Sequence, residues 1–164
     1  MKVGIGLGSN LGDRLQNLRH AKAFLLSLST EQWHRASPVY ETAPVDCPPG
    51  SAAFLNAALE IEFAGTPAAF LKKLQAYEAG QGRDRSAGPN APRPIDLDIL
   101  YFGELEVREP GLVIPHPRLA ERRFVLVPLS TIAPDRIIKG TGRTVRQLLR
   151  ELAGDDVRFV QQDW

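Results

Sequence analysis

Residues 91–100 read Ala91-Pro92-Arg93-Pro94-Ile95-Asp96-Leu97-Asp98-Ile99-Leu100 and place two carboxylates two residues apart in an otherwise apolar segment. Because side chains alternate between the faces of a strand, this spacing predicts a strand with Asp96 and Asp98 on one face and apolar residues on the other. Same-face neighbours lie roughly 6.5–7 Å apart, a span over which two carboxylates can hold divalent ions about 3.5–4 Å apart. A strand whose aspartates simply face solvent fits the spacing equally well.

The cations around this segment favour the metal-site interpretation. Arg93 lies between two prolines, and Arg83 and Arg85 occupy a Gly- and Ser-rich loop just upstream. Oxygen ligands alone favour Mg²⁺ over Zn²⁺, and arginines beside such a site are typical of polyphosphate binding. We therefore expect a magnesium-assisted site for a phosphate-bearing ligand.

The composition predicts one globular domain over residues 1–164. Lys and Arg number 20 against 19 Asp and Glu, so the charge balance gives no support for nonspecific nucleic-acid binding. The single cysteine, Cys47, excludes an intramolecular disulfide and fits a reducing compartment; we interpret it as a plain loop thiol. No apolar run approaches a membrane span, and the chain starts with strand-like sequence. We therefore expect a cytoplasmic protein with no membrane partner.

The hydrophobic periodicity predicts a mixture of helices and strands. Short links between the strands favour antiparallel pairing, so the expected fold class is α+β with helices packed on a mostly antiparallel sheet. The expected strands are 3–7, 33–40, 54–63, 95–100, 105–107 and 112–114, and the expected helices are 11–28, 68–79 after a Thr66-Pro67 cap, part of 119–132, and 144–153 with Thr144 as its cap.

Two further positions are candidates for ligand contact. His116 lies between Pro115 and Pro117, so its imidazole is either rigidly presented to a phosphate or an ordinary turn residue. Asn56 lies in an apolar run, two residues after Phe54; if buried, its amide needs a partner, either a heterocycle edge or neighbouring backbone. The N-terminal glycines match neither the G-x-G-x-x-G nor the P-loop pattern, so any nucleotide is held in another way.

Five segments together resemble the folate-pathway 6-hydroxymethyl-7,8-dihydropterin pyrophosphokinases, and the similarity runs over nearly the whole chain. The resemblance implies a ferredoxin-like α+β fold, usually monomeric, that transfers diphosphate from ATP to the hydroxymethyl group of a reduced pterin and releases AMP. The segments are Gly8-Ser9-Asn10-Leu11-Gly12-Asp13, Phe54-Leu55-Asn56-Ala57-Ala58, Gln81-Gly82-Arg83, Pro92-Arg93-Pro94-Ile95-Asp96-Leu97-Asp98-Ile99-Leu100 and Pro115-His116-Pro117-Arg118.

The same resemblance implies roles for individual residues. Asp96 and Asp98 would bind two Mg²⁺ ions that bridge the ATP phosphates, and Arg83 and Arg93 would complete the catalytic set from a closing loop. The implied ATP contacts are Gln75, Glu78, Arg85, Ile99, His116 and Arg122. The implied pterin contacts are Gly8, Thr42, Pro44, Val45, Phe54, Asn56 and Phe124.

The chain departs from some relatives on the nucleotide side. Asn90 falls where several relatives have a loop tryptophan, and Gly111 and Val113 replace an arginine and a threonine that precede the histidine. Arg108 or Arg118 is a candidate to supply the missing charge. Two rival functions are a pterin- or nucleotide-binding regulator without catalysis and a metal-dependent phosphohydrolase in which water replaces the pterin.

Overall fold

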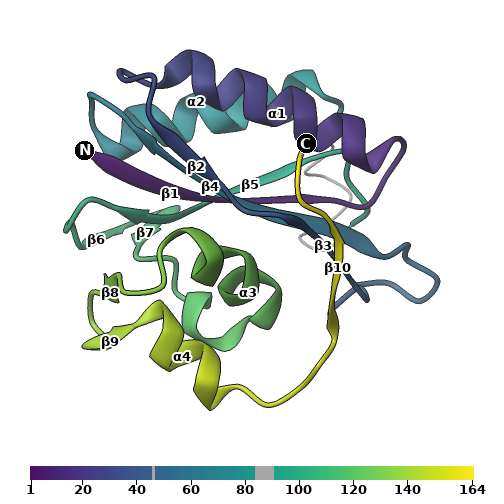
Figure 1. Cartoon of the computed structure of the whole chain (residues 1–164). Helices are drawn as coiled ribbons and strands as arrows, with labels where there is room; N and C mark the ends of the chain where they lie inside the picture. The colour runs from purple at the N-terminus through teal and green to yellow at the C-terminus, as the bar shows by residue number, and fades with distance from the viewer. Residues whose placement is uncertain (46, 84–90) are drawn as a thin grey trace.

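An antiparallel sheet forms the centre of the fold in a computed structural model that describes residues 1–45, 47–83 and 91–164 (Figure 1). Its strand order is β10-β3-β4-β1-β5, and β2 pairs with the other part of β4. Every pair in the sheet is antiparallel, as predicted. The strands are β1 (Lys2–Ser9), β2 (His34–Ala36), β3 (Val39–Thr42), β4 (Phe54–Glu62), β5 (Asp96–Phe102) and β10 (Val157–Gln161).

Helices cover both faces of the sheet, α1 and α2 on one side and α3 and α4 on the other (Figure 1). Each side has its own hydrophobic core, and β5 contributes to both because its side chains alternate. Leu97 and Ile99 join the core under α1 and α2, whereas Leu100 joins the core under α3 and α4. The predicted ferredoxin-like α+β architecture is confirmed. The helices are α1 (Arg14–Leu28), α2 (Pro67–Gly80), α3 (Arg123–Ile132) and α4 (Val145–Glu151).

Side-chain caps set where the helices begin. The Thr66 hydroxyl accepts a hydrogen bond from the Ala69 N–H at 3.2 Å, and Thr144 forms a capping box with Gln147, both at the predicted starts. The expected start of α1 at residue 11 is three residues early, because Asp13 is the cap and accepts the Gln16 N–H at 3.0 Å. Helix α4 ends at Glu151, two residues before the expected end.

Short elements outside the main sheet complete the description. The strand expected over 112–114 is confirmed as β7, whereas the strand expected over 105–107 lies two residues later as β6 and pairs with β7, not with β5. A second two-stranded pair, which was not expected, follows α3. None of the helices in residues 1–45, 47–83 and 91–164 combines the length and hydrophobicity that a membrane crossing requires. The elements are β6 (Val107–Glu109), β7 (Leu112–Ile114), the 3₁₀ turn η2 (Leu119–Glu121), β8 (Ile137–Ile138) and β9 (Arg143–Thr144).

Within the main sheet, one strand prediction was wrong and one strand was missed. The strand expected over 33–40 divides into β2 and β3 at Ser37 and Pro38, because the proline has no N–H for the ladder and Ser37 bonds Ala58 instead. There the Ser37 N–H donates to the Ala58 carbonyl at 2.9 Å, and the Ser37 hydroxyl accepts the Ala58 N–H at 2.8 Å. Strand β10 was not expected, because its mostly exposed residues show no alternation of burial.

Candidate active site

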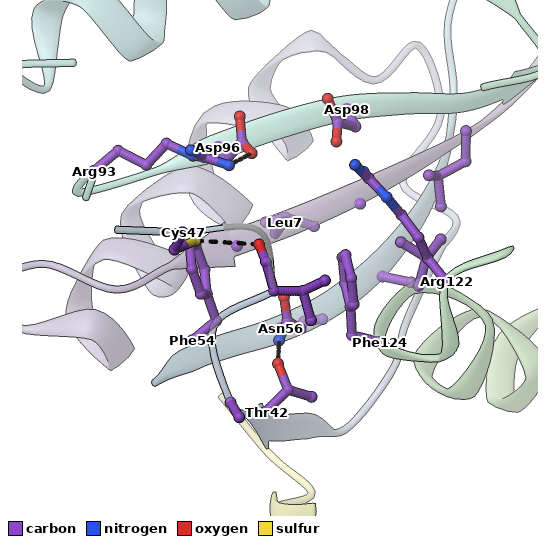
Figure 2. Close-up of a pocket in the computed structure, with 18 residues that line it drawn as sticks. Leu7, Thr42, Cys47, Phe54, Asn56, Arg93, Asp96, Asp98, Arg122 and Phe124 are labelled. Carbon is purple, nitrogen blue, oxygen red and sulfur yellow. Dashed lines mark hydrogen bonds and ion pairs between the residues drawn. The ribbon is translucent and has the colours of Figure 1, made fainter. Parts of the chain in front are cut away.

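Strand β5 presents Asp96 and Asp98 on the face that turns toward α3, and both side chains line one hollow of the molecule (Figure 2). The residues between and after them, Leu97 and Ile99, are buried in the opposite core. The alternation predicted for this segment is therefore confirmed. The two carboxylates differ in surroundings, because the Asp96 side chain is 17% exposed and the Asp98 side chain is 40% exposed.

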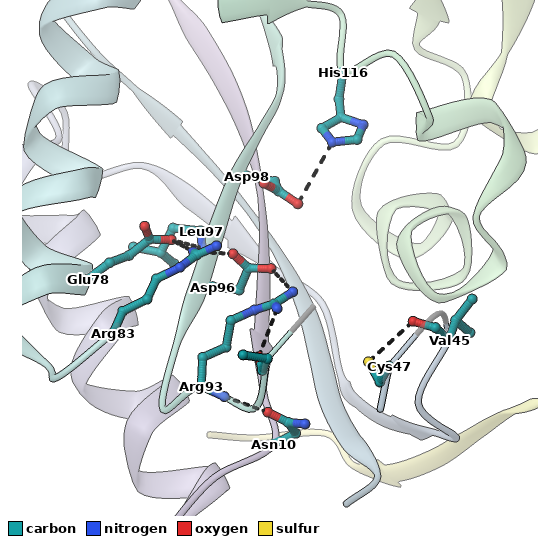
Figure 3. A network of polar contacts seen from close by, with 11 residues as sticks. Asn10, Val45, Cys47, Glu78, Arg83, Arg93, Asp96, Leu97, Asp98 and His116 are labelled. Atoms are coloured by element: carbon teal, nitrogen blue, oxygen red, sulfur yellow. Dashed lines mark hydrogen bonds and ion pairs between the residues drawn. The ribbon is translucent and has the colours of Figure 1, made fainter. Parts of the chain in front are cut away.

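Two arginines hold the Asp96 carboxylate from both sides (Figure 3). Arg93 Nη2 donates to Asp96 Oδ2 at 2.6 Å, and Arg83 Nη1 donates to Asp96 Oδ1. Charge-assisted hydrogen bonds of this kind are stronger than neutral ones. Arg83 and Arg93 therefore place two positive charges at the first aspartate.

Glu78 of α2 supports this arrangement from the interior. It is 1% exposed, and its Oε1 accepts the backbone N–H of Leu97 at 2.8 Å and Nη1 of Arg83 at 2.5 Å. One carboxylate thus ties α2 to the beginning of β5 and orients the arginine that reaches Asp96. The structure therefore places Glu78 in the interior, behind the strand that carries the two aspartates.

The second aspartate lies beside a neutral histidine. Although its side chain is 40% exposed, the surrounding protein withdraws Asp98 from bulk water, and this desolvation and the nearby charge of Asp96 raise its pKa to about 6, against the opposing effect of Arg122. His116 Nε2 lies 3.9 Å from Asp98 Oδ2, but burial and the charges of Arg122 and Arg118 lower the pKa of His116 to about 4. Since His116 Nδ1 accepts the Arg118 N–H at 3.1 Å, the neutral ring carries its proton on Nε2, which is directed toward Asp98.

Beneath the aspartates the hollow forms a slot between two phenylalanine rings (Figure 2). Phe54 and Phe124 stand on its two sides, and each ring has an arginine over it. Arg93 Cζ lies 5.5 Å from the centre of the Phe54 ring, and Arg122 Cζ lies 5.4 Å from the centre of the Phe124 ring. A flat apolar molecule placed in the slot would therefore have positive charges at both sides.

An amide and a glycine form the base of the slot. Asn56 is 5% exposed, and its Nδ2 donates to Thr42 Oγ1 at 2.8 Å, so the orientation of the amide is set by β3. Gly8 of β1 is paired with both Asn56 and Asp96 across the sheet. A Cβ at this glycine would project between Phe54 and Asn56, at 3.6 Å and 3.5 Å respectively. The base of the slot is therefore polar at its centre and lacks one side chain.

A second hollow lies on the other side of Asp98, between α2 and β7. Among the described residues, Asp98 is the one that lines both hollows. The second hollow is more apolar in composition, apart from this carboxylate and the His116 ring. Its lining consists of Leu71, Leu97, Asp98, Ile99, Gly111, Leu112, Val113, His116 and Pro117.

Comparison with known proteins places this geometry in a family. The family model described as 7,8-dihydro-6-hydroxymethylpterin-pyrophosphokinase (HPPK) matches residues 4–134. The chain belongs to this family. The 2-amino-4-hydroxy-6-hydroxymethyldihydropteridine pyrophosphokinase of Bacillus subtilis is 42% identical over 128 residues, covering 78% of this chain and 75% of that protein. The enzyme of the same name from Methylorubrum extorquens is 38% identical over 157 residues, covering 96% of this chain and 97% of that protein.

A solved structure with the same fold is that of Plasmodium falciparum HPPK-DHPS, with a TM-score of 0.72 at 14% sequence identity. The match covers 92% of this pyrophosphokinase chain and 44% of the Plasmodium chain. The chain therefore spans less than half the length of that protein. At this low identity the match supports the fold of the pyrophosphokinase and not its residue roles.

The first hollow brings together most of the residues that the sequence assigned to pterin in this pyrophosphokinase. Pro44 is the exception, because its neighbours Ala43 and Val45 line the hollow and it does not. Cys47 also lines the hollow, a position that sequence reasoning treated as a plain loop thiol; its only signal was its place in the proline-rich loop. The assigned residues found in the lining are Gly8, Thr42, Val45, Phe54, Asn56 and Phe124.

The residues assigned to ATP in the pyrophosphokinase are more dispersed. Ile99 and His116 line the second hollow, and Arg122 lines the first. Gln75 is exposed on α2 and lines neither hollow, and Glu78 is buried as described above. Arg85 and Asn90 lie outside the described residues.

The donor set fits magnesium. Among the described residues, no three His, Cys, Asp or Glu side chains come together as a metal-binding group, so Asp96 and Asp98 are the acidic ligands available in the hollow. Mg²⁺ is usually bound by one or two carboxylates, with waters and substrate phosphates as its other ligands. Two carboxylates on one face are therefore sufficient for Mg²⁺ delivered with a nucleotide.

Proposed function

We propose that this pyrophosphokinase brings its two substrates together at Asp98, with the pterin in the first hollow and the ATP phosphates reaching it from the second. The enzyme transfers diphosphate from ATP to the hydroxymethyl group of 6-hydroxymethyl-7,8-dihydropterin in folate biosynthesis, giving AMP and the pterin diphosphate. The observation that carries the proposed placement is that Asp98 lines both hollows.

For the pterin, the slot supplies the contacts that a flat, polar-edged ring requires. Phe54 and Phe124 would stack on its two faces, and aromatic stacking contributes about 0.5–1.5 kcal/mol beyond burial. Asn56, oriented by its bond to Thr42, would bind the polar edge with the remaining capacity of its amide. Gly8 would leave room for the ring. These residues, together with Val45 and Pro44 of the loop, form the proposed pterin site.

For the metal, Asp96 and Asp98 would hold two Mg²⁺ ions. When bound, these ions would polarise the phosphate oxygens and offset their charge. The support is the shared face of the two carboxylates and the raised pKa of Asp98, since a cation would relieve the charge repulsion that contributes to raising it. Arg83 and Arg93 lie at the same carboxylate and would offset charge on the transferred diphosphate.

The chemical step consists mainly of positioning and charge neutralisation. The hydroxymethyl oxygen forms a bond to the β-phosphorus of ATP and gives up its proton to solvent, while the bond from that phosphorus to the bridging oxygen breaks and AMP leaves with that oxygen. The neutral His116 would donate its Nε2–H to a phosphate oxygen, and Arg122 would add a positive charge near both Asp98 and His116. Enclosure by the slot would keep out water, which is the competing acceptor.

The experiment that tests the proposed reaction is incubation with ATP, Mg²⁺ and the hydroxymethyl pterin. AMP formed only when the pterin is present supports transfer, whereas ATP loss without pterin supports a phosphohydrolase and no turnover supports a binding protein. Asp98→Ala is expected to lower turnover by orders of magnitude, and near-normal activity with Mg²⁺ present would refute its role. Arg93→Ala is expected to slow the chemical step far more than it weakens pterin binding.

We also propose that the enzyme acts as a monomer and as a single domain over residues 1–164 in the cytoplasm. One sheet with a core on each face supports the single domain, and the monomer follows from the resemblance to a family whose members are usually monomeric. The lone Cys47 fits a reducing compartment. Light scattering behind a size-exclusion column tests the monomer, and a mass twice that of the chain would contradict it.

A further inference from the structure

We propose that Asn10 is a positioning residue that holds Arg93 in its place at Asp96 and links it to the pterin slot. This inference rests on the proposed roles of Arg93 and Phe54. Asn10 follows β1 directly and is 3% exposed. It is not among the residues that line either hollow, so its effect on the reaction passes through the residues that it binds.

Asn10 holds the backbone of Arg93 through a pair of reciprocal hydrogen bonds (Figure 3). The Arg93 N–H donates to Asn10 Oδ1 at 2.9 Å, and the Asn10 N–H donates to the Arg93 carbonyl at 3.3 Å. The two residues are 83 positions apart in the sequence. Since Pro92 and Pro94 restrict the backbone on both sides, these two bonds determine where the Arg93 side chain starts.

From this fixed backbone position, the Arg93 guanidinium makes three contacts. Nη2 reaches Asp96 Oδ2 at 2.6 Å, Nη1 donates to the Ala91 carbonyl at 3.1 Å, and Cζ lies 5.5 Å from the centre of the Phe54 ring. A displacement of the Arg93 backbone would move all three contacts together. Misplacement of a catalytic group by about 1 Å can lower a rate by about 100-fold.

The other end of the Asn10 amide contacts the segment that enters β4. Asn10 Nδ2 donates to the Ala52 carbonyl at 3.4 Å, two residues before Phe54. The same amide therefore contacts the backbone of the catalytic arginine and the backbone that leads to the ring under that arginine. An acceptor is needed on one side and a donor on the other, which an amide supplies and a carboxylate does not.

The test separates the two sides of the amide. Asn10→Ala removes both contacts, so we expect a single-turnover rate of diphosphate transfer roughly 10- to 100-fold lower and a raised pterin KM. Asn10→Asp keeps the acceptor for the Arg93 N–H and loses the donor to Ala52, so we expect most of the rate to return while the pterin KM stays raised. Asn17→Ala in α1 is the matched control, because its Nδ2 donates to the Leu11 carbonyl at 2.9 Å and to Ser9 Oγ at 3.3 Å, on either side of Asn10.

A double-mutant cycle distinguishes positioning from general loss of structure. If Asn10 acts through the Arg93 guanidinium, Asn10→Ala changes the single-turnover rate less than about twofold when Arg93 is already alanine. Additive effects in the cycle, or an equal rate loss in Asn17→Ala, would overturn the inference. If Asn10→Ala does not fold by circular dichroism, Asn10→Ser takes its place in the cycle.

The Arg93→Ala variant distinguishes a failure of the proposed role of Arg93 from a failure of the proposed role of Asn10. A slow Arg93→Ala enzyme with a normal Asn10→Ala enzyme overturns the positioning role alone. An Arg93→Ala enzyme with the wild-type single-turnover rate overturns the proposed role of the arginine and, with it, that of Asn10.

Discussion

Replacing Gly8 by alanine places a methyl group in the proposed pterin site without disturbing the fold. The added Cβ would lie 3.5 Å from Asn56 Oδ1, 3.6 Å from Phe54 Cδ1 and 3.9 Å from Asp96 Cβ, which are ordinary contact distances. The free energy of unfolding should therefore stay within about 1 kcal/mol of the wild-type value.

The bound pterin, by contrast, would overlap with the added methyl group. Overfilling a packed site by one methyl group costs about 1–3 kcal/mol. Since about 1.4 kcal/mol corresponds to a tenfold change in Kd, the affinity for the pterin should fall roughly 5- to 150-fold. Isothermal titration calorimetry with the pterin measures this change, and urea denaturation monitors the fold in parallel.

Gly4→Ala on the same strand is a control that should lower the stability of the fold and leave the pterin affinity unchanged. A Cβ at Gly4 would overlap the ring of Tyr101, which is buried and whose hydroxyl donates to Glu60. We expect this variant to lose about 1–3 kcal/mol of stability and to keep its pterin affinity at temperatures where it is folded. A Gly8→Ala enzyme that binds pterin as tightly as the wild type would show that the ring does not lie against β1.

Three other perturbations test separate parts of the structure. Because the pKa of Asp98 is raised to about 6, its carboxylate is ionised at neutral pH and protonated at lower pH. The apparent Kd for Mg²⁺, measured by calorimetry with a non-hydrolysable ATP analogue, should therefore rise ~10-fold per pH unit below 6. Asp98→Asn should remove this dependence on pH. Tyr101→Phe leaves the buried Glu60 without that donor, so urea denaturation should show a loss of about 1–3 kcal/mol while both KM values stay unchanged. Thr42→Val keeps a similar side-chain volume but removes the oxygen that accepts a hydrogen bond from the Asn56 amide. Steady-state kinetics should give a pterin KM about 5- to 10-fold higher and an unchanged KM for ATP. An unaltered pterin KM would show that the Asn56 amide does not bind the pterin.

Sequence reasoning succeeded where a feature depends on neighbouring residues. The common face of Asp96 and Asp98 follows from the two-residue period of a strand, and the caps Thr66 and Thr144 follow from bonds made within one helical turn. It failed over residues 33–40, where a bond from Ser37 to a distant strand replaces the local ladder.

The sequence also assigned Glu78 to the nucleotide, and the structure shows why a motif alone does not settle such a role. A carboxylate on a helix before the loop is compatible with either a surface contact or an internal one. Packing of α2 against β5 buries the side chain against the Leu97 N–H and Arg83, a placement that the motif does not contain. The assigned role at the nucleotide stays a prediction.

By itself the sequence determined the paired acids of β5, the alternation of helices and strands, and the resemblance to the pyrophosphokinases, because each of these is carried by residues close together in the chain. Only the tertiary structure decided which groups meet. It set Asn10 against Arg93, Asn56 against Thr42, and Asp98 between two hollows. Such contacts depend on sheet register and on how helices pack over the sheet, and these are properties of the whole chain that no local pattern contains.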